Sequence, residues 1–205
     1  MQTRPLTLRQ VQLIKVHIES ELEDSEKGST DKGQRDLALF CTAVDTMLRA
    51  GDLLKLTVED VADEMGAIRA EFPVTMGKTG KTLVVQLFPF TRKRLAKWIK
   101  SSGKEGPDHL FTRVRSRGLD YMFKPIGVRR YELLVKEWIG KYLHISTKEY
   151  SGHSLRKTRA AYIYQRTRNL EVCRRLLGHA NIQTTIRYLG IDERTALDVA
   201  RQFEM

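Results

Sequence analysis

The residues whose types and spacing could do chemistry gather in the last third of the chain. His153 and Arg156 stand three positions apart, so they share one face of a predicted helix. A Leu-Leu-Gly-His sequence ends a helical stretch at His179, and Tyr188 follows nine positions later. Taken singly, each residue is ordinary in a packed or solvated position. Together with Arg49 they provide two guanidiniums, two imidazoles and a phenol, a set typical of a site that handles a phosphate.

Other catalytic motifs do not account for this sequence. Residues 77–82 resemble a nucleotide-binding P-loop, but that pattern requires a glycine five positions before Gly80, where the chain has Thr75. The segment also lies between two predicted strands rather than before a helix. The sequence has no His-Glu-x-x-His zinc motif and no Gly-x-Ser-x-Gly nucleophile elbow. We therefore predict no ATP site, no metal site and no cofactor.

The charge of the chain favours a polyanionic partner. The 205 residues include 36 Lys and Arg against 25 Asp and Glu, a formal net charge of +11. Residues 1–50 carry 7 basic and 8 acidic side chains, whereas residues 51–205 carry 29 and 17. A bias confined to one part of a chain suggests a basic face toward nucleic acid. The alternative is a basic surface that only keeps the protein in solution.

The sequence also indicates a cytoplasmic protein without a membrane segment. No apolar run approaches the roughly 20 residues that a membrane-spanning helix needs, and the first residues lack the apolar core of a signal peptide. The cysteines, Cys41 and Cys173, lie far apart and form neither a disulfide framework nor a zinc site. A reduced intracellular compartment is the natural interpretation.

Apolar spacing predicts a mainly helical α+β fold with one small antiparallel sheet. Short β-branched runs fill residues 56–87 and are interrupted at residues 76–80, as by a hairpin turn. A break with a capping aspartate is expected near residues 49–52. Loops are expected at 27–33 and 101–108, and helices at 7–24, 37–48, 91–100, 130–142 and, as short pieces, over the last 55 residues.

At this point the sequence resembles the catalytic domain of the tyrosine recombinases, the phage-integrase family. The resemblance covers about residues 30 to 190 and rests on an arginine after the second helix, a hairpin lysine, His-x-x-Arg, Leu-Gly-His and a tyrosine nine residues on. These are Arg49, Lys78, His153, Arg156, His179 and Tyr188, with Asp52 as the usual acidic residue. The resemblance implies a single catalytic domain over residues 1–205, with a small antiparallel three-stranded sheet and a tail helix at 192–205. The chain has little room for a separate N-terminal core-binding domain. It is similar in size to the short fimbrial-switch invertases, unless it is a trimmed form.

The resemblance also implies the chemistry. Tyr188 would attack a DNA phosphate and leave a 3′-phosphotyrosyl bond with a free 5′-hydroxyl. His153 would transfer the phenolic proton, and Lys78 would protonate the departing oxygen. The two arginines would hold the non-bridging oxygens, with His179 supporting the phosphate by hydrogen bonding. Because the covalent bond conserves the energy of the broken linkage, rejoining would need neither ATP nor metal.

Several assignments remain open at this point. Lys81 lies on the same turn as Lys78 and rivals it, and Asp52 could cap a helix, orient Arg49 or do both. Trp98 and Trp138 are expected in the core or an interface. The alternative phenols are Tyr150, Tyr162 and Tyr164, and the candidate DNA-phosphate clamps are Arg113, Arg115, Arg117, Arg129 and Arg130.

The expected partner is double-stranded DNA carrying a specific recombination site. The resemblance implies a homo-oligomer, a tetramer around two duplexes, with accessory DNA-bending proteins as further partners. The apolar residues of the 192–205 tail would pack on their own core or dock into a neighbouring protomer. Two rival functions are a type IB topoisomerase, which reseals one strand without exchanging partners, and a helix-turn-helix regulator built on residues 169–189.

Overall fold

The computed structural model describes residues 3–23, 30–113, 124–191 and 201. Its strands are β1 (Glu71–Thr75) and β2 (Thr82–Gln86). Its helices are α1 (Leu8–Glu23), α2 (Thr30–Thr46), α3 (Ala50–Leu53), α4 (Val58–Val61), α5 (Pro89–Ser102), α6 (Val128–Leu143), α7 (Gly152–Thr167), α8 (Leu170–Leu177) and α9 (Ile182–Leu189). None of these helices is both long and apolar enough to cross a membrane.

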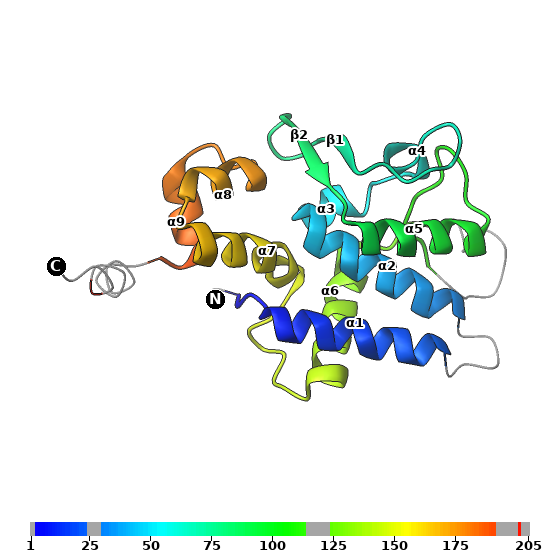
Figure 1. Cartoon of the computed structure of the whole chain (residues 1–205), viewed down its shortest axis with the longest axis horizontal. Coiled ribbons are helices and arrows are strands. Elements are labelled where there is room, and N and C mark those ends of the chain that lie inside the picture. Colours follow the sequence, from blue (N-terminus) through cyan, green and yellow to red (C-terminus); the bar gives the residue numbers. More distant parts are fainter. Residues whose placement is uncertain (1–2, 24–29, 114–123, 192–200, 202–205) are drawn as a thin grey trace.

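The centre of the core is α2, which lies between α1 and α5 with α6 crossing behind (Figure 1). Residues 35–43 of α2 are all buried, because neighbouring helices cover it on several sides. The predicted helix over residues 7–24 is confirmed as α1, which buries its apolar stripe of Val11, Ile14 and Ile18. Trp98 and Trp138 are also in the core, as predicted, at 2% and 3% exposure.

The predicted hairpin is confirmed, but the sheet has two strands in the described residues rather than three. Strand β1 pairs antiparallel with β2 from Glu71 opposite Gln86 to Thr75 opposite Thr82. The β-branched run that precedes β1 forms the short helix α4 instead, because Thr57 and Asp60 make a capping box at its start. After α4 the chain contributes only an isolated bridge between Ala62 and Ile68.

The predicted loop over residues 27–33 is wrong at its C-terminal end, because α2 begins at Thr30. Gly33 serves helix packing there, not a turn: a Cβ at this position would lie 2.6 Å from Cδ2 of Leu22 on α1. The glycine therefore lets the two helices approach closely, and Asp31 in the first turn suits the positive end of the helix dipole.

Helices α7, α8 and α9 form a smaller group at one end of the molecule (Figure 1). Met47, Ala160 and Leu177 are its buried apolar centre, and Tyr188 packs against this cluster. The predicted tail helix at 192–205 and the arginines Arg115 and Arg117 lie outside the described residues, of which only Arg201 falls within the tail.

Candidate active site

Arg49 and Asp52 lie where the chain passes from α2 to α3. The chain leaves α2 through Met47, a buried residue in the left-handed conformation at φ 52°, and Arg49 becomes the N-cap of α3. A non-glycine residue with positive φ is uncommon and is kept only where packing holds it. Arg49 lies close enough to the α7–α9 group for its charge to act on Arg156, His179 and Tyr188.

Asp52 ties α3 to the hairpin and does not cap a helix. Its carboxylate is 7% exposed, and its Oδ1 accepts a hydrogen bond from the backbone N–H of Gly77 at 2.9 Å. A Cβ at Gly77 would lie 3.2 Å from that same oxygen, so glycine suits this close approach. The expectation that Asp52 caps a helix is corrected: the residue lies within α3, whose N-cap is Arg49.

Both candidate lysines are exposed on the hairpin. Lys78 directly follows the anchored Gly77, within a turn in which Thr79 and Gly80 both donate to the carbonyl of Met76. Lys81 lies at the far side of the turn, where its carbonyl accepts from Met76. The bond from Asp52 therefore fixes the backbone next to Lys78 and leaves the lysine side chain in solvent.

Helix α7 presents His153 and Arg156 from its first two turns. The Ser151 side chain caps the start of the helix by accepting a hydrogen bond from the N–H of His153. In return, the Ser154 hydroxyl oxygen accepts from the backbone N–H of Ser151. His153 is exposed, whereas Arg156 is only 2% exposed. The guanidinium of Arg156 donates from Nη2 to the carbonyl of Leu177 at 2.7 Å, which fixes its orientation across to α8.

The α8–α9 connection sets His179 against Tyr188. Gly178 ends α8 in the left-handed conformation at φ 63°, which glycine adopts without strain, and turns His179 into the protein. The Nδ1 atom of His179 shares a 3.1 Å hydrogen bond with Oγ1 of Thr185. The rings of His179 and Tyr188 meet edge to face, with centroids 5.3 Å apart.

Tyr188 rests half-buried beside the two arginines. Its hydroxyl donates to the backbone carbonyl of His153 at 3.3 Å, a long hydrogen bond. The guanidinium carbon of Arg156 lies 6.0 Å from the centre of the Tyr188 ring. Burial raises the pKa of Tyr188 to about 12, although Arg156 and Arg49 act in the opposite direction. The phenol is therefore protonated at neutral pH.

Loss of water contact and the nearby arginine charges lower the pKa of both histidines, the buried His179 more than the exposed His153. Burial, followed by the positive charges of Arg156 and Arg49, lowers the pKa of His179 to about 4. Partial loss of water contact, followed by the charge of Arg156, likewise lowers the pKa of His153 from its ordinary value. Because the same two arginines act on both imidazoles and on the phenol, these five side chains form one electrostatic unit.

Two donors of that unit lack acceptors. The Nη1 atoms of Arg49 and Arg156 are buried, and neither has a hydrogen-bond partner among the described residues. A buried polar atom left unpaired costs free energy, and a charged one costs more. The Oδ2 atom of Asp52 is also buried and unpartnered, so it supplies negative charge nearby without occupying either nitrogen. The arrangement suits an anion that offers two acceptor oxygens.

Sequence reasoning missed several residues that hold the site in place. Thr185 has no motif that links it to His179, six positions earlier. Glu132 accepts from the N–H of Gly152 at 2.7 Å and so supports the start of α7 from α6. A Cβ at Gly152 would lie 2.5 Å from Cε1 of Tyr131, which explains a glycine at the start of this helix. The Gly152–Glu132 pair spans 20 positions, and the six positions between His179 and Thr185 form no recognised motif, so neither gave a signal in the sequence.

The remaining candidates lie around this unit. Arg113 and Arg129 are exposed, whereas Arg130 binds the Glu137 carboxylate through both terminal nitrogens, at 2.7 and 3.3 Å. Of the alternative phenols, Tyr162 and Tyr164 lie near the end of α7 remote from His153, beside Arg166 and Arg168, and Tyr150 precedes that helix. Within the described ranges, no cluster of His, Cys, Asp and Glu side chains could hold a metal ion.

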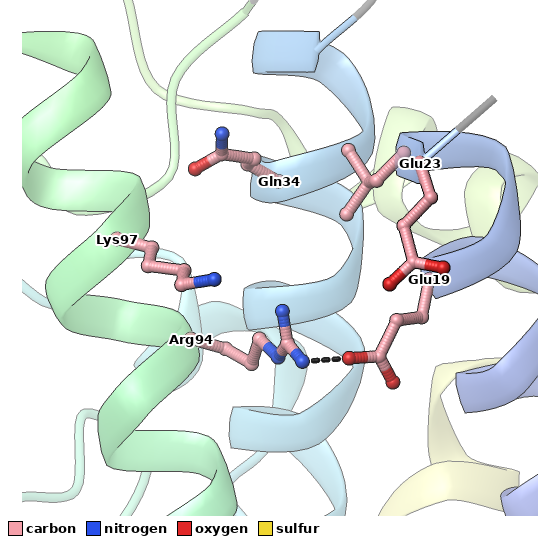
Figure 2. Close-up of a pocket in the computed structure, with 6 residues that line it drawn as sticks. Glu19, Glu23, Gln34, Arg94 and Lys97 are labelled. Carbon is pink, nitrogen blue, oxygen red and sulfur yellow. Dashed lines mark hydrogen bonds and ion pairs between the residues drawn. The ribbon is translucent and has the colours of Figure 1, made fainter. Parts of the chain in front are cut away.

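A separate pocket of about 190 Å³ lies between α1, α2 and α5. Figure 2 shows acidic Glu19 and Glu23 from α1 facing basic Arg94 and Lys97 from α5, with Gln34 of α2 beside them. Arg94 and Glu19 form an ion pair across it. Nε of Arg94 is also buried without a hydrogen-bond partner, but Glu19 and Glu23 balance the positive charge of this pocket, so it suits a phosphate less well than the site beside Tyr188 does.

Comparison with known proteins identifies the family. The model of the phage integrase family matches residues 4–194, so the chain belongs to this family of tyrosine recombinases. It is 30% identical over 176 residues to the probable integrase/recombinase YoeC of Bacillus subtilis, covering 85% of this chain and 88% of that protein. It is 31% identical over 186 residues to a tyrosine recombinase of Pseudothermotoga lettingae, covering 91% of this chain but 58% of that protein.

A solved structure shows the same fold. The site-specific recombinase XerH, in a post-cleavage complex with a palindromic difH substrate, matches 98% of this chain with a TM-score of 0.72 and 21% identity. The match covers 53% of the XerH chain, so the present chain spans about half of that protein. The mainly helical domain with its small antiparallel sheet is therefore a tyrosine-recombinase catalytic fold.

Proposed function

We propose that this protein is a site-specific DNA recombinase that cleaves and rejoins strands through a 3′-phosphotyrosyl bond on Tyr188. The observation that carries the proposal is the pair of buried, acceptor-free Nη1 atoms of Arg49 and Arg156 beside the phenol. A phosphodiester has two non-bridging oxygens that can accept from two such donors. The tyrosine supplies the nucleophile that a simple phosphate-binding site would not need.

The guanidiniums stabilise the transition state more than the ground state. The attacked phosphorus gathers negative charge on its oxygens, and both arginines stay protonated throughout the reaction. Each donor held in place in a water-poor site contributes about 3–4 kcal/mol of transition-state stabilisation. Arg156 is already oriented by its bond to Leu177, so it loses little conformational freedom when the phosphate binds.

The phenol needs a base because its pKa is raised to about 12. Neutral His153 lies at the surface of the site, and its backbone carbonyl already accepts from the Tyr188 hydroxyl. In the reaction the Tyr188 oxygen forms the bond to phosphorus, its proton passes to the His153 ring, and the bond from phosphorus to the 5′-oxygen breaks. Lys78 gives a proton to that oxygen, which leaves as a 5′-hydroxyl.

His179 acts as a neutral hydrogen-bonding group in this scheme. With a pKa of about 4 its imidazole is uncharged at neutral pH. When the Thr185 hydroxyl donates to Nδ1, the proton of the imidazole is on Nε2, which can donate to a phosphate oxygen. Rejoining reverses these steps with the 5′-hydroxyl of a new strand. The phosphotyrosyl bond conserves the energy of the broken linkage, so neither ATP nor a metal is required.

The proposed partner is a specific double-stranded DNA site, bound by a tetramer on two duplexes. The solved relative XerH is bound to its difH substrate, which supports DNA as the substrate class. The net charge of +11 supports it too, because neutralising phosphates supplies sequence-independent affinity.

The test is covalent capture of DNA. Wild-type protein is mixed with a pool of nicked duplexes that carry a randomised central segment, so that the cleaved fragment diffuses away and the adduct accumulates. Denaturing gels should show a protein–DNA adduct whose recovered DNA has a free 5′-hydroxyl end and a common sequence. Tyr188→Phe should abolish the adduct and leave DNA binding within about twofold, because the lost hydroxyl is a nucleophile and not an anchor.

Tyr150→Phe is the matched control and should form the adduct at the wild-type rate. An adduct on the Tyr188→Phe protein would contradict the proposal. Joining recovered sites to each other distinguishes recombination from a topoisomerase, which would relax supercoiled plasmid and give no recombinant product. DNA binding without any adduct would favour a regulator.

A further inference from the structure

The first described residues form a strap against α7, the helix that carries His153 and Arg156. We call residues Thr3–Thr7 the strap. Figure 1 shows the N-terminal end of the chain beside α7. The backbone N–H of Leu6 donates to Oγ1 of Thr158 at 3.0 Å in a buried hydrogen bond, and Leu6 itself is 4% exposed. The strap is therefore fixed to the second turn of α7.

A second connection runs through Lys157. Its ammonium donates to the backbone carbonyl of Thr3 at 3.2 Å. The same ammonium lies 5.9 Å from the centre of the Tyr188 ring, near the limit for a cation–π contact. Lys157 thus binds the strap on one side and lies near the Tyr188 ring on the other, and the residue before it, Arg156, carries one of the two unpaired guanidinium donors.

The burial of Lys157 calls for a reason. The residue is 4% exposed, and burial lowers the pKa of its amine. An apolar side chain of similar length would fill this space without the cost of removing an ammonium from water. Leu6 already provides apolar packing between the strap and α7. What the ammonium adds is a hydrogen bond donated to the Thr3 carbonyl, which an apolar side chain cannot make, and a positive charge near the Tyr188 ring.

We propose that the strap, acting through Lys157 and Thr158, positions Tyr188 and α7 for strand cleavage. The proposal rests on the proposed function and assigns Lys157 as a positioning residue. Arg156, Lys157 and Thr158 are consecutive on α7, so a shift of the strap moves the backbone that carries the Arg156 guanidinium. Displacing the Thr3 carbonyl also removes the acceptor that holds the Lys157 ammonium beside the ring. Movement of the strap would therefore alter cleavage more than DNA binding.

The experiment compares variants in pairs. Thr158→Val removes the acceptor for Leu6 N–H and keeps the side-chain shape, whereas Thr158→Ser keeps the hydroxyl. Lys157→Met removes the ammonium and keeps the length, and Lys136→Met removes a charge from an exposed lysine on α6 as the control. Each full-length protein is measured for the single-turnover rate of adduct formation with the nicked duplexes recovered by wild type. The DNA dissociation constant and the amide hydrogen exchange of α7 and α9 without DNA are also measured.

We expect Lys157→Met and Thr158→Val to form the adduct about tenfold more slowly, because small displacements of a reacting group cost this much or more. DNA affinity should stay within about twofold, since neither side chain is a proposed phosphate ligand. Amide exchange of α7 and α9 should become faster in both variants. Thr158→Ser should restore the rate and the protection, and Lys136→Met should match wild type.

Wild-type rates and wild-type exchange in both variants would overturn the strap proposal and leave the proposed function standing. Slower cleavage that Thr158→Ser fails to restore, or that comes with an equal loss of DNA affinity, would also overturn it, because the effect would then reflect general damage to the fold. If Lys157→Met does not fold, the Thr158 pair decides. If wild type forms no adduct, the proposed function fails. The strap proposal is then tested by the amide exchange of α7 and α9 alone. Exchange in Lys157→Met and Thr158→Val that equals wild type overturns the proposal, and faster exchange supports a link between the strap and these helices.

Discussion

The two sides of the candidate site are built differently. On the α7–α9 side, Arg156, His179 and Tyr188 are held by contacts to one another and to neighbouring backbone or hydroxyl groups. On the hairpin side, Lys78 is exposed, and its turn is tied to the rest of the molecule by the hydrogen bond that the Gly77 N–H donates to Asp52. The proposed phosphate ligand Arg156 and the proposed nucleophile Tyr188 are thus held by internal contacts, whereas the proposed proton donor Lys78 is surrounded by solvent.

This difference suits the order of events in strand cleavage. Groups that stabilise charge in the transition state act best when they need no reorganisation, which is the state of Arg156. A proton donor to the leaving oxygen must reach an atom whose position depends on the bound DNA. An exposed lysine with a long side chain on an anchored turn can do so. The following predictions test the two sides separately.

The largest effect is expected on the ordered side. Arg156→Lys should lower the single-turnover cleavage rate about 10³-fold, because the single nitrogen of a lysine cannot replace two nitrogens held apart in a rigid fork, one on the Leu177 carbonyl and one toward the phosphate. Arg166→Lys, an exposed position on the same helix, is the control and should leave the rate unchanged. A rate for Arg156→Lys within about tenfold of wild type would show that the fixed guanidinium is not needed.

On the hairpin side, Lys78→Ala should slow cleavage about 10²-fold, the effect of losing a general acid. A substrate with sulfur in place of the bridging 5′-oxygen should restore the rate, because a thiolate leaves without a proton. Lys81→Ala is the matched variant and should behave as wild type with both substrates. If Lys81→Ala instead shows the slower cleavage and its rescue by the sulfur substrate, Lys81 is the general acid and Lys78 is not.

The pH dependence of stability reports on His179 in the ordered side. The pKa of this histidine is about 4 in the folded protein against an ordinary value of 6.5, so between these pH values the unfolded chain binds the proton more readily. The free energy of unfolding should therefore fall as the pH drops from 6.5 toward 4, by about 2–3 kcal/mol from this residue. Urea unfolding of His179→Gln should lack this part of the decrease. Equal pH dependence in the variant and wild type would show that the imidazole is not buried in a neutral form.

The smallest effect concerns the surface around the site. Arg129→Ala should reduce the slope of log affinity against log salt by about 0.9, the value for one lost phosphate contact. Arg130→Ala should reduce it less, because the Arg130 guanidinium is already bound to Glu137. Fluorescence anisotropy of a labelled duplex at several salt concentrations measures both slopes. Equal slopes for the two variants would mean that the ion pair opens on DNA.

Much of the fold was predictable where one segment decides its own structure. The apolar stripe of α1 and the hairpin turn at residues 76–80 are local patterns, and both were found. The two errors have different causes, one a contact between helices and the other a local capping box that was overlooked. Gly33 suggested a loop but permits contact with Leu22 of another helix, and the run before β1 looked like a strand although the Thr57–Asp60 capping box makes it helical.

The sequence by itself determined the chemical groups of this protein, because His-x-x-Arg, Leu-Gly-His and the spaced tyrosine are short motifs whose residues stay close along the chain. Tertiary structure decided which of their atoms remain unpaired. The hydrogen bond between Gly77 and Asp52 spans 25 positions, and the one between Lys157 and Thr3 spans 154. Packing between segments this far apart also leaves the Nη1 atoms of Arg49 and Arg156 buried without a partner. The spacing of apolar residues shows which face of a helix is buried. It does not show which carbonyl or carboxylate from a distant segment accepts a hydrogen bond from a residue on that face.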